Sequence, residues 1–307
     1  MNEEKIFVTE EGCRIDHFLK EKYPEFSRTF IQKQIKDGTV SVNENPVKSN
    51  YILKNGDTVV FAFSEPQDIE NIEAKDLGIV VLYEDEDFIF VNKPKGLVVH
   101  PAPGHYDDTL VNGLLYYAKD SLSGINGVLR PGIVHRIDKD TTGVIVVCKN
   151  DEAHKYMAGL LEEHNIKRSY RAIVYGCINE NEGTINAPIG RHPIDRKKMA
   201  VGVKNAKPAI THYKVLERFQ GYTYIECVLE TGRTHQIRVH MASIHHPLLG
   251  DEVYAKNAKN KRFEGQTLHA YTLGFKHFRT GEQLCITAPL PEYFIKTLEH
   301  LEKYNSL

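Results

Sequence analysis

The chain opens with two stretches in which apolar residues recur every three or four positions, followed by short stretches in which they alternate with polar ones. Ser27 is a residue type that caps helices, and Gly38 is the type that ends them. Ile31 and Ile35 fall on one face of the helix between these two residues, and basic residues fall on the opposite face. The pattern predicts two helices, over residues 14–23 and 28–37, and two strands, over residues 39–43 and 58–63.

The pattern changes at a polar, acidic stretch over residues 64–77, which predicts a linker. Beyond it, strand and helix patterns mix without regular alternation. Strands are predicted over residues 79–83, 88–92, 144–148, 170–175 and 222–229, and helices over residues 110–116 and 152–163. This mixture favours an α+β fold with a mixed, mostly antiparallel central sheet. The predicted organisation is a small N-terminal α/β module over residues 1–63, the linker, and a larger domain over residues 78–307.

The composition is that of a water-soluble globular protein. The chain has 307 residues, of which 41% are hydrophobic and 26% are charged. No apolar run approaches the ~18–20 residues of a membrane helix. The first residues are acidic and lack the basic and apolar regions of a secretion signal. The five cysteines are far apart and form no C-x-x-C pair, so reduced thiols are expected. We expect a cytoplasmic protein with no membrane partner, and a monomer by default.

The net charge of −2 is unevenly distributed. Residues 64–87 carry nine acids and one lysine, a local charge of −8, and the rest of the chain therefore carries +6. Basic residues concentrate in residues 191–207 and 256–262. Clustered basic segments in a near-neutral protein are compatible with a polyanionic partner, although each run by itself is also compatible with a solvated loop.

Motifs that bind nucleotides or metals are missing from the sequence. It contains no glycine-rich phosphate loop, no dinucleotide-binding fingerprint, and neither the serine-hydrolase nor the zinc-protease motif. Of the fifteen histidines, His235, His240 and the pair His245–His246 share one polar stretch. No cysteine or carboxylate lies at ligand spacing within that stretch. The sequence therefore predicts no metal and no cofactor.

A dense polar cluster over residues 135–143 leads directly into the apolar run Val144–Cys148. The β-branched residues of that run predict a buried strand, and a loop fixed by such a strand is a suitable place for a catalytic group. Asp138 is the candidate within this loop. Aspartate also favours turns through its side-chain hydrogen bonds, so a purely local function of Asp138 stays open at this point.

A second polar cluster covers residues 231–242. Apolar residues recur at helical spacing from Ile237 onward, which predicts a helix with Thr234 as its N-cap; a strand over residues 234–240 is the alternative. In the helix, Arg238 would lie in the first turn. Such an arginine is either solvated or paired with a carboxylate, which it would keep ionised and oriented.

The N-terminal module contains the run SRTFIQKQIKDGTVSVNENPVK, followed by LKNGDTVVF. This run resembles the small RNA-binding module that is named after a ribosomal small-subunit protein and recurs in RNA-modifying enzymes. The resemblance implies that the second helix lies against RNA, with Arg28, Lys33 and Lys36 at phosphates. Each phosphate contact releases counterions, so the affinity would depend on salt.

Segments of the larger domain carry a second resemblance. They are VNKPKGLVVHPAPG, TLVNGLL, HRIDKDTTGVIVVCKN, KRSYRAIVYG, ETGRTHQIRVHMA, HHPLLGD and LHAYTLGF. In this order they resemble the RluA-type ribosomal RNA pseudouridine synthases over essentially the whole chain. Within that family, the N-terminal module and the residues after Asp138 are most similar to the synthase D branch, which modifies large-subunit rRNA. Ile137 stands where leucine is more usual, a conservative difference.

The resemblance implies a role for each matched residue. Asp138 would be the catalytic aspartate and Arg238 its ion-pair partner, with the arginine fork holding the carboxylate at two points. Tyr170, otherwise an ordinary strand aromatic, would stack on the target uracil and help to take the proton from its carbon 5. His135 and Arg136 would help to displace the target base and hold the RNA, and Arg233 is a further candidate for binding RNA.

The implied reaction detaches uracil from ribose, rotates the base and rejoins it through carbon 5, so substrate and product are isomers and no cofactor is needed. One carboxylate can carry this reaction. Whether it attacks ribose, attacks uracil or removes a ribose proton to give a glycal stays open. Two other classes also stay open: an RNA-binding or ribosome-assembly protein without catalysis, and a hydrolase with an aspartate nucleophile that acts on a small substrate.

Overall fold

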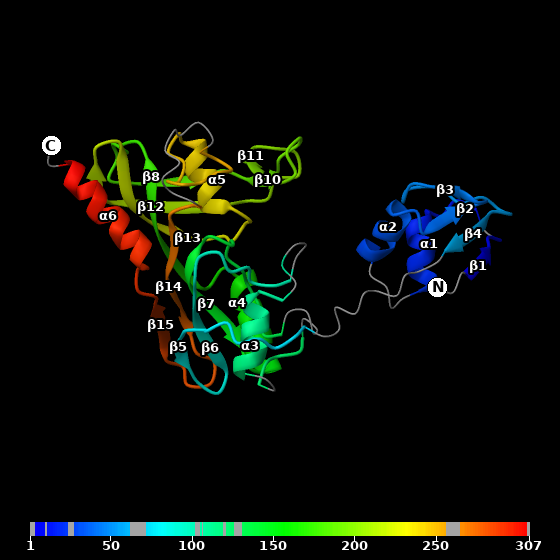
Figure 1. The fold of residues 1–307 in the computed structure, drawn as a ribbon, viewed down its shortest axis with the longest axis horizontal. Coiled ribbons are helices and arrows are strands. Elements are labelled where there is room, and N and C mark those ends of the chain that lie inside the picture. The colour runs from blue at the N-terminus through cyan, green and yellow to red at the C-terminus, as the bar shows by residue number, and fades with distance from the viewer. Residues whose placement is uncertain are drawn as a thin grey trace. The chain divides into compact units, whose positions relative to one another are not determined.

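Two units, divided between Asn71 and Ile72, make up the computed structural model (Figure 1), and each has its own hydrophobic core. The structure describes residues 4–9, 11–23, 28–61, 72–101, 105, 107–118, 121–125, 131–255 and 265–305, without the side chains of residues 29, 30, 33, 304 and 305. Ser27, the predicted helix cap, lies outside these residues.

The first unit is a small α/β module built around one sheet. Its elements are β1 (Glu4–Phe7), α1 (Ile15–Lys22), α2 (Arg28–Lys36), β2 (Val40–Val42), β3 (Asn45–Pro46) and β4 (Thr58–Phe61). The strands pair antiparallel in the order β1-β4-β2-β3. The two helices bury Leu19, Ile31 and Ile35 in the core, which confirms the predicted helical spacing. Gly38 follows α2 with a φ of +81°, a conformation that suits glycine.

The described residues of the second unit form the larger sheet and four helices. The strands are β5 (Val81–Glu84), β6 (Phe88–Lys93), β7 (Thr142–Cys148), β8 (Lys167–Tyr175), β9 (Glu182–Asn186), β10 (Ile189–Arg191), β11 (Met199–Val201), β12 (Ile210–Phe219), β13 (Tyr222–Leu229), β14 (Leu268–Lys276) and β15 (Gln283–Thr287), and the helices are α3 (Leu110–Ala118), α4 (Asp151–Glu162), α5 (Gln236–Ser243) and α6 (Glu292–Asn305). The central sheet has the order β5-β6-β7-β14-β8-β13-β12-β9, with β15 paired to β14, while β10 and β11 pair separately. Among the described strand pairs of this sheet, β7 and β14 are parallel and the others antiparallel, so the predicted α+β fold is confirmed.

The β7 strand is buried on both faces. Val144, Val146 and Cys148 pack in the cluster that includes α4, whereas Ile145 and Val147 pack in the cluster that includes α3. Burial on both faces explains why this run is apolar without alternation. The loop before β7 is therefore anchored to one of the most deeply buried strands of the unit.

The segment predicted as a linker, residues 64–77, belongs partly to the second unit. The backbone N–H of Lys75 donates to the carbonyl of Asn112 at 3.0 Å, and Asn112 Nδ2 donates to the carbonyl of Glu73 at 2.9 Å. These contacts use the backbone of the segment, which has no side-chain periodicity to reveal them. Residues 62–71 lie outside the described part of the chain, and the independence of the first unit stays a prediction. Of the helices described, none has both the length and the apolar character that crossing a membrane requires.

Candidate active site

Asp138 lies in the polar loop that leads into β7. Ile137 before it is buried, and the N–H of Thr141 donates to the backbone carbonyl of Asp138 at 3.1 Å, which closes a turn. The turn uses the backbone of Asp138 and leaves its carboxylate available. That side chain is 20% exposed and lines a cavity of the second unit.

Close contacts on both sides fix the backbone of this loop. Lys93, at the end of β6, is fully buried, and its Nζ donates to the carbonyl of Lys139 at 2.8 Å. Gly143 has a φ of +108°, and a Cβ there would collide with the backbone carbonyl of Ala270. The chain around Asp138 is therefore in place before a substrate binds, as an active site requires.

Arg238 lies on α5, but this helix begins differently from the prediction. Its N-cap is His235, whose φ of +57° is in the left-handed region, so the prediction of Thr234 as the cap is wrong. The side chain of Gln236 closes the preceding loop instead, because its Oε1 accepts the N–H of Arg233 at 2.9 Å. The strand alternative for this segment is also wrong.

Arg238 joins two carboxylates from distant parts of the chain. Its Nη1 donates to Asp138 Oδ2 at 2.8 Å. Its Nε and Nη2 donate to Oδ2 and Oδ1 of Asp251, at 2.7 and 2.9 Å. The two-point contact therefore goes to Asp251, and the predicted two-point hold on Asp138 is wrong. The physical reason is that one edge of the planar fork can face only one carboxylate in this way, which leaves a single nitrogen for the other.

Asp251 is a site residue that the sequence analysis missed. Its side chain is fully buried and also accepts the backbone N–H groups of Val253 at 2.9 Å and Tyr254 at 3.1 Å. A tight turn thus fixes Asp251, and Asp251 fixes Arg238. The residue ends the segment HHPLLGD, but nothing in the local pattern shows that this acid is buried beside an arginine.

The charges of this group are set by burial and by ion pairing. Burial alone would lower the pKa of Arg238, but hydrogen bonds and charges of Asp251 and Asp138 raise it, so the guanidinium stays charged. His235 Nε2 lies 3.8 Å from Asp138 Oδ1, yet burial lowers the pKa of His235 and favours the neutral ring. Arg238 is therefore the cation that faces Asp138. Within the described residues, Asp138 Oδ1 has no hydrogen bond.

Tyr170 on β8 lines the same cavity as Asp138. The cavity has a volume of about 350 Å³ and adjoins a smaller one of about 60 Å³. The residues that line both are Arg136, Asp138, Tyr170, Leu229, Arg233 and His235. Burial raises the pKa of Tyr170, so its phenol keeps its proton at neutral pH. The site brings together a paired carboxylate, an aromatic ring and cations around a space large enough for a small ligand.

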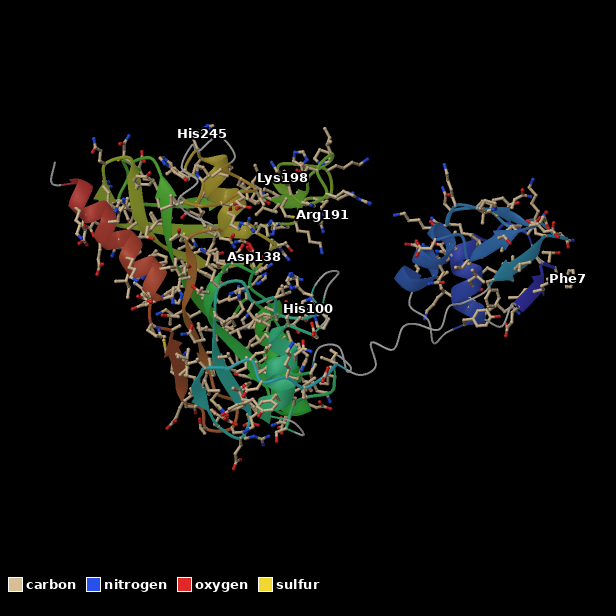
Figure 2. All side chains as sticks on the ribbon, viewed as in Figure 1. Phe7, His100, Asp138, Arg191, Lys198 and His245 are labelled. Carbon is tan, nitrogen blue, oxygen red and sulfur yellow. The ribbon has the colours of Figure 1, made fainter. Side chains whose placement is uncertain are left out.

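Arg136 and Arg233, two of the residues predicted to hold RNA, lie at this cavity. Arg136 is exposed, with Nη1 at 3.2 Å from Nε2 of His100. Arg233 is half-buried, and its Nε donates to the carbonyl of Pro208 at 3.0 Å. Figure 2 shows Asp138 on the same side of the second unit as His100, Arg191 and Lys198, three of the residues that it labels. The structure thus places cations beside the candidate carboxylate.

His135, the third of these residues, has different surroundings. Its Nε2 accepts the backbone N–H of Val146 at 3.1 Å. Burial, together with the charge of Arg168, lowers the pKa of His135 to about 3. The neutral ring of His135 is hydrogen-bonded to β7 and supports the loop of Asp138. Because it offers no positive charge to a phosphate, this geometry does not favour the predicted contact with RNA.

In the first unit, Arg28 has a partner within the protein. Its Nη2 lies 3.0 Å from Oδ2 of Asp16, whose side chain is fully buried. Burial raises the pKa of Asp16, but side-chain hydrogen bonds, including one from Arg28, lower it to about 2. The ion pair links α1 to α2, and a phosphate contact of Arg28 stays a prediction. Lys36 is exposed, whereas the side chain of Lys33 lies outside the described residues.

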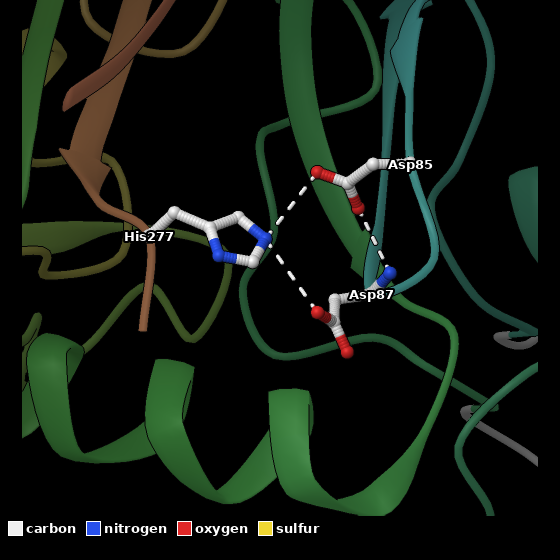
Figure 3. A group of neighbouring side chains, drawn as sticks. All are labelled: Asp85, Asp87 and His277. Carbon is white, nitrogen blue, oxygen red and sulfur yellow. Dashed lines mark hydrogen bonds and ion pairs between the residues drawn. The ribbon is translucent and has the colours of Figure 1, made fainter. Parts of the chain in front are cut away.

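A cluster with the residue types of a metal site is formed by Asp85, Asp87 and His277 (Figure 3). His277 Nε2 lies 3.4 Å from Asp85 Oδ2 and 3.5 Å from Asp87 Oδ2. Asp85 also accepts the N–H groups of Asp87 and Phe88, and Asp87 accepts Nε of Arg279 at 2.7 Å. Because hydrogen bonds and an arginine already use these carboxylates, the contacts support an ion-pair cluster that joins the β5–β6 turn to the end of β14.

A mixed sheet with a charge-paired aspartate and a tyrosine at one cavity, preceded by a small module with a basic helix, is an arrangement suited to an enzyme that acts on RNA. Comparison with known families gives the class. Residues 87–243 match the family described as RNA pseudouridylate synthase, and residues 13–59 match the S4 domain. The chain belongs to the RNA pseudouridylate synthase family and carries an S4 domain. It is thus an isomerase with RNA as its substrate class, and the predicted family is confirmed.

Relatives match nearly the full length of the chain. It is 50% identical to "Uncharacterized RNA pseudouridine synthase YlyB" of Bacillus subtilis (strain 168), over 99% of both chains. It is 43% identical to "Ribosomal large subunit pseudouridine synthase D" of Zymomonas mobilis, over 95% of both chains. Among solved structures, "Human RNA Pseudouridylate Synthase Domain Containing 4" is similar with a TM-score of 0.57 and 25% identity, over 73% of this chain and 93% of that chain.

Proposed function

We propose that this pseudouridine synthase modifies uridines of large-subunit ribosomal RNA and uses Asp138 as its catalytic carboxylate. The observation that carries the mechanism is the contact of Arg238 Nη1 with Asp138 Oδ2, at 2.8 Å, in the wall of a cavity. The substrate is supported by relatives that are named large-subunit pseudouridine synthase D and match most of the chain.

The reaction exchanges one bond of the ribose for another. The bond between ribose C1′ and uracil N1 breaks, the base turns, and a bond between C1′ and uracil C5 forms. N1 gains a proton and C5 loses one, so the balance needs no further reactant. A carboxylate assists the departure of the base as a nucleophile or as a general base. Asp138 suits either role because Arg238 donates to its Oδ2 and orients the carboxylate, while Oδ1 carries no hydrogen bond within the described residues.

Tyr170 supplies an aromatic surface next to Asp138. Base–aromatic stacking contributes about 1–3 kcal/mol per base, which helps to offset the few kcal/mol needed to unstack a target nucleotide. The raised pKa of Tyr170 favours this stacking role over the acceptance of a proton, because a protonated phenol is not a base. Arg136 is exposed and lines the same cavity, which supports a contact with the RNA beside the displaced base.

Mapping of pseudouridines in large-subunit rRNA, from cells with and without this protein, tests the proposal. We expect specific uridines to stay unmodified when the protein is missing. Wild-type protein should restore them, and Asp138→Asn should not. An identical map in both cells would contradict the substrate, and full restoration by Asp138→Asn would contradict the mechanism.

The alternative classes predict other outcomes. A binding protein without catalysis would show no difference between wild-type protein and Asp138→Asn in the isomerisation of purified RNA, because neither would form pseudouridine. A hydrolase would release free uracil or another small product. Chromatography of the nucleosides and bases after incubation separates these outcomes.

A further inference from the structure

Arg168 is a buried cation at the wall of the cavity that contains Asp138. It lies on β8, two positions before Tyr170, so both side chains stand on the same face of the strand. Its residue is 7% exposed, and it lines the cavity of about 350 Å³ together with Tyr170 and Arg233. The mechanism described above gives Arg168 no function.

Among the described residues, the guanidinium of Arg168 lacks the carboxylate partners that the buried Arg238 has. Within the described residues its one hydrogen bond runs from Nη2 to the carbonyl of Glu230 at 3.0 Å, and its Nε is buried without a partner. No carboxylate of the described chain lies within 4.0 Å of it. Arg238, which is equally buried, contacts two carboxylates. A buried charge without a counterion is costly, and a bound anion would remove that cost.

The cavity around Arg168 has a positive balance. Arg136 and Arg233 line it as well, and Asp138 is the one carboxylate among its described lining residues. Asp138 is already paired with Arg238. His135 adds no positive charge, since burial lowers its pKa to about 3. An anion that enters this space therefore meets arginines that have no carboxylate partner among the described residues, beside a carboxylate that is already paired with Arg238.

Gly232 provides the room for this guanidinium. A Cβ at Gly232 would lie 2.6 Å from Nη1 of Arg168, and this glycine has an ordinary backbone conformation. The backbone of Gly232 therefore lies directly against the guanidinium of Arg168. An alanine at this position would displace the end of the flexible arginine side chain and spare the backbone.

We propose that Arg168, assisted by Arg233, binds a backbone phosphate of the RNA next to the target uridine. This inference rests on the proposed function. If the base stacks on Tyr170 and the ribose lies at Asp138, the phosphate of the same or the next nucleotide lies near Arg168, which lines the same cavity. Positions two apart on a strand are separated by about 7 Å, which matches the scale of one nucleotide. A planar arginine fork suits the tetrahedral oxygens of a phosphate. The contact would anchor the nucleotide on one side while Tyr170 holds the base.

The first test compares how the RNA affinity of the full-length wild type and of two variants depends on salt. Binding of a large-subunit rRNA transcript is measured by filter retention at several KCl concentrations for wild type, Arg168→Met and Lys167→Met. Lys167 is the matched control, because it is exposed on the same strand and lies outside the residues that line the cavity. We expect Arg168→Met to reduce the slope of log K against log salt by about 0.7–0.9, as loss of one phosphate contact predicts, and to weaken binding more than Lys167→Met does. Equal slopes for wild type and Arg168→Met would overturn the proposal, whether or not the protein forms pseudouridine.

The second test locates the contact. In a synthetic stem-loop around a mapped target uridine, each flanking phosphate is replaced in turn by an uncharged methylphosphonate. One replacement should weaken binding to wild type about tenfold and have no further effect on Arg168→Met. Gly232→Ala should lose the same sensitivity while it keeps the melting temperature of the wild type, which covers the case that Arg168→Met folds poorly. If Arg168→Met and Gly232→Ala still lose affinity when that phosphate is replaced, the proposal is overturned. Formation of pseudouridine by the wild type tests the proposed function separately.

Discussion

The fork of Arg238 faces Asp251, and a single remaining nitrogen contacts Asp138. Arg238 is thus oriented by Asp251, which does not line the two cavities that Asp138 lines. Asp138 faces the positive charge of Arg238, but among the described residues its carboxylate has one hydrogen bond, and Oδ1 has none. A charge that is fixed in this way does not have to reorient during the reaction. Such preorganised charges are usually the largest contribution to electrostatic catalysis.

Asp251→Asn should slow isomerisation although Asp251 does not line the cavities beside Asp138. Asparagine keeps the shape of the side chain, but its amide nitrogen cannot accept from Arg238, so the fork loses one contact and its orientation. We expect kcat to fall roughly 100-fold, as for other small displacements of catalytic groups, with little change in KM. Asp107→Asn, at an exposed carboxylate of the same unit, is the control and should be unaffected. An unchanged kcat for Asp251→Asn would show that Arg238 needs no such support.

Arg238→Ala should inactivate the enzyme and destabilise the second unit. It leaves the buried side chain of Asp251 without its counterion, which costs roughly 3–5 kcal/mol of unfolding free energy. Arg238→Lys keeps the charge, but one ammonium cannot reproduce the three-nitrogen contact with both carboxylates, so we expect partial activity. Urea denaturation and the isomerisation rate measure the two effects. Full activity of Arg238→Ala would refute the ion pair as a requirement for catalysis.

Asp16 should make the stability of the first unit depend on pH. Its pKa in the folded chain is about 2, below the ordinary value of 3.8. A lowered folded pKa means that the stabilisation is complete above pH ~4 and is lost as the pH falls towards ~2, by about 2 kcal/mol in total. Asp16→Asn should be less stable at neutral pH and should flatten this dependence. Unfolding of the first unit in urea across this pH range measures both, and parallel curves for the two proteins would contradict the assignment.

The second unit should fold without the first when the chain begins at Ile72. The division falls at this residue, and Glu73 and Lys75 contact Asn112. A chain that begins at Gly78, the start of the predicted domain, should be less stable because it loses these contacts. Thermal unfolding of both truncated chains measures the difference. Equal melting temperatures would show that residues 72–77 act only as a linker.

The elements that the sequence predicted are those with a local signal. The apolar run of β7 and the spacing of Ile31 and Ile35 report burial directly, so both elements are confirmed. The start of α5 was misplaced because a left-handed residue, His235, precedes the helix, and such a conformation has no signature in the capping pattern.

The site was only partly accessible to the sequence for a different reason. Asp138 and Arg238 belong to distinctive polar clusters, and their contact is confirmed at 2.8 Å. Asp251 and Arg168 carry no such signal. Asp251 matters because it is buried against Arg238, and Arg168 because its buried Nε has no partner among the described residues. Both are properties of the tertiary structure, which brings together strands and loops that lie far apart along the chain.

The release of tritium from RNA labelled at carbon 5 of uridine tests the central claim most directly, because this proton leaves only when the base is rejoined through that carbon. Full-length wild type should release tritium from a large-subunit rRNA transcript in proportion to the pseudouridine formed. Asp138→Asn should fold and bind the RNA with similar affinity but release tritium at less than a few per cent of the wild-type rate, as expected when a catalytic group is removed. Release by Asp138→Asn at a rate comparable to that of wild type would contradict the assignment of Asp138 as the catalytic carboxylate.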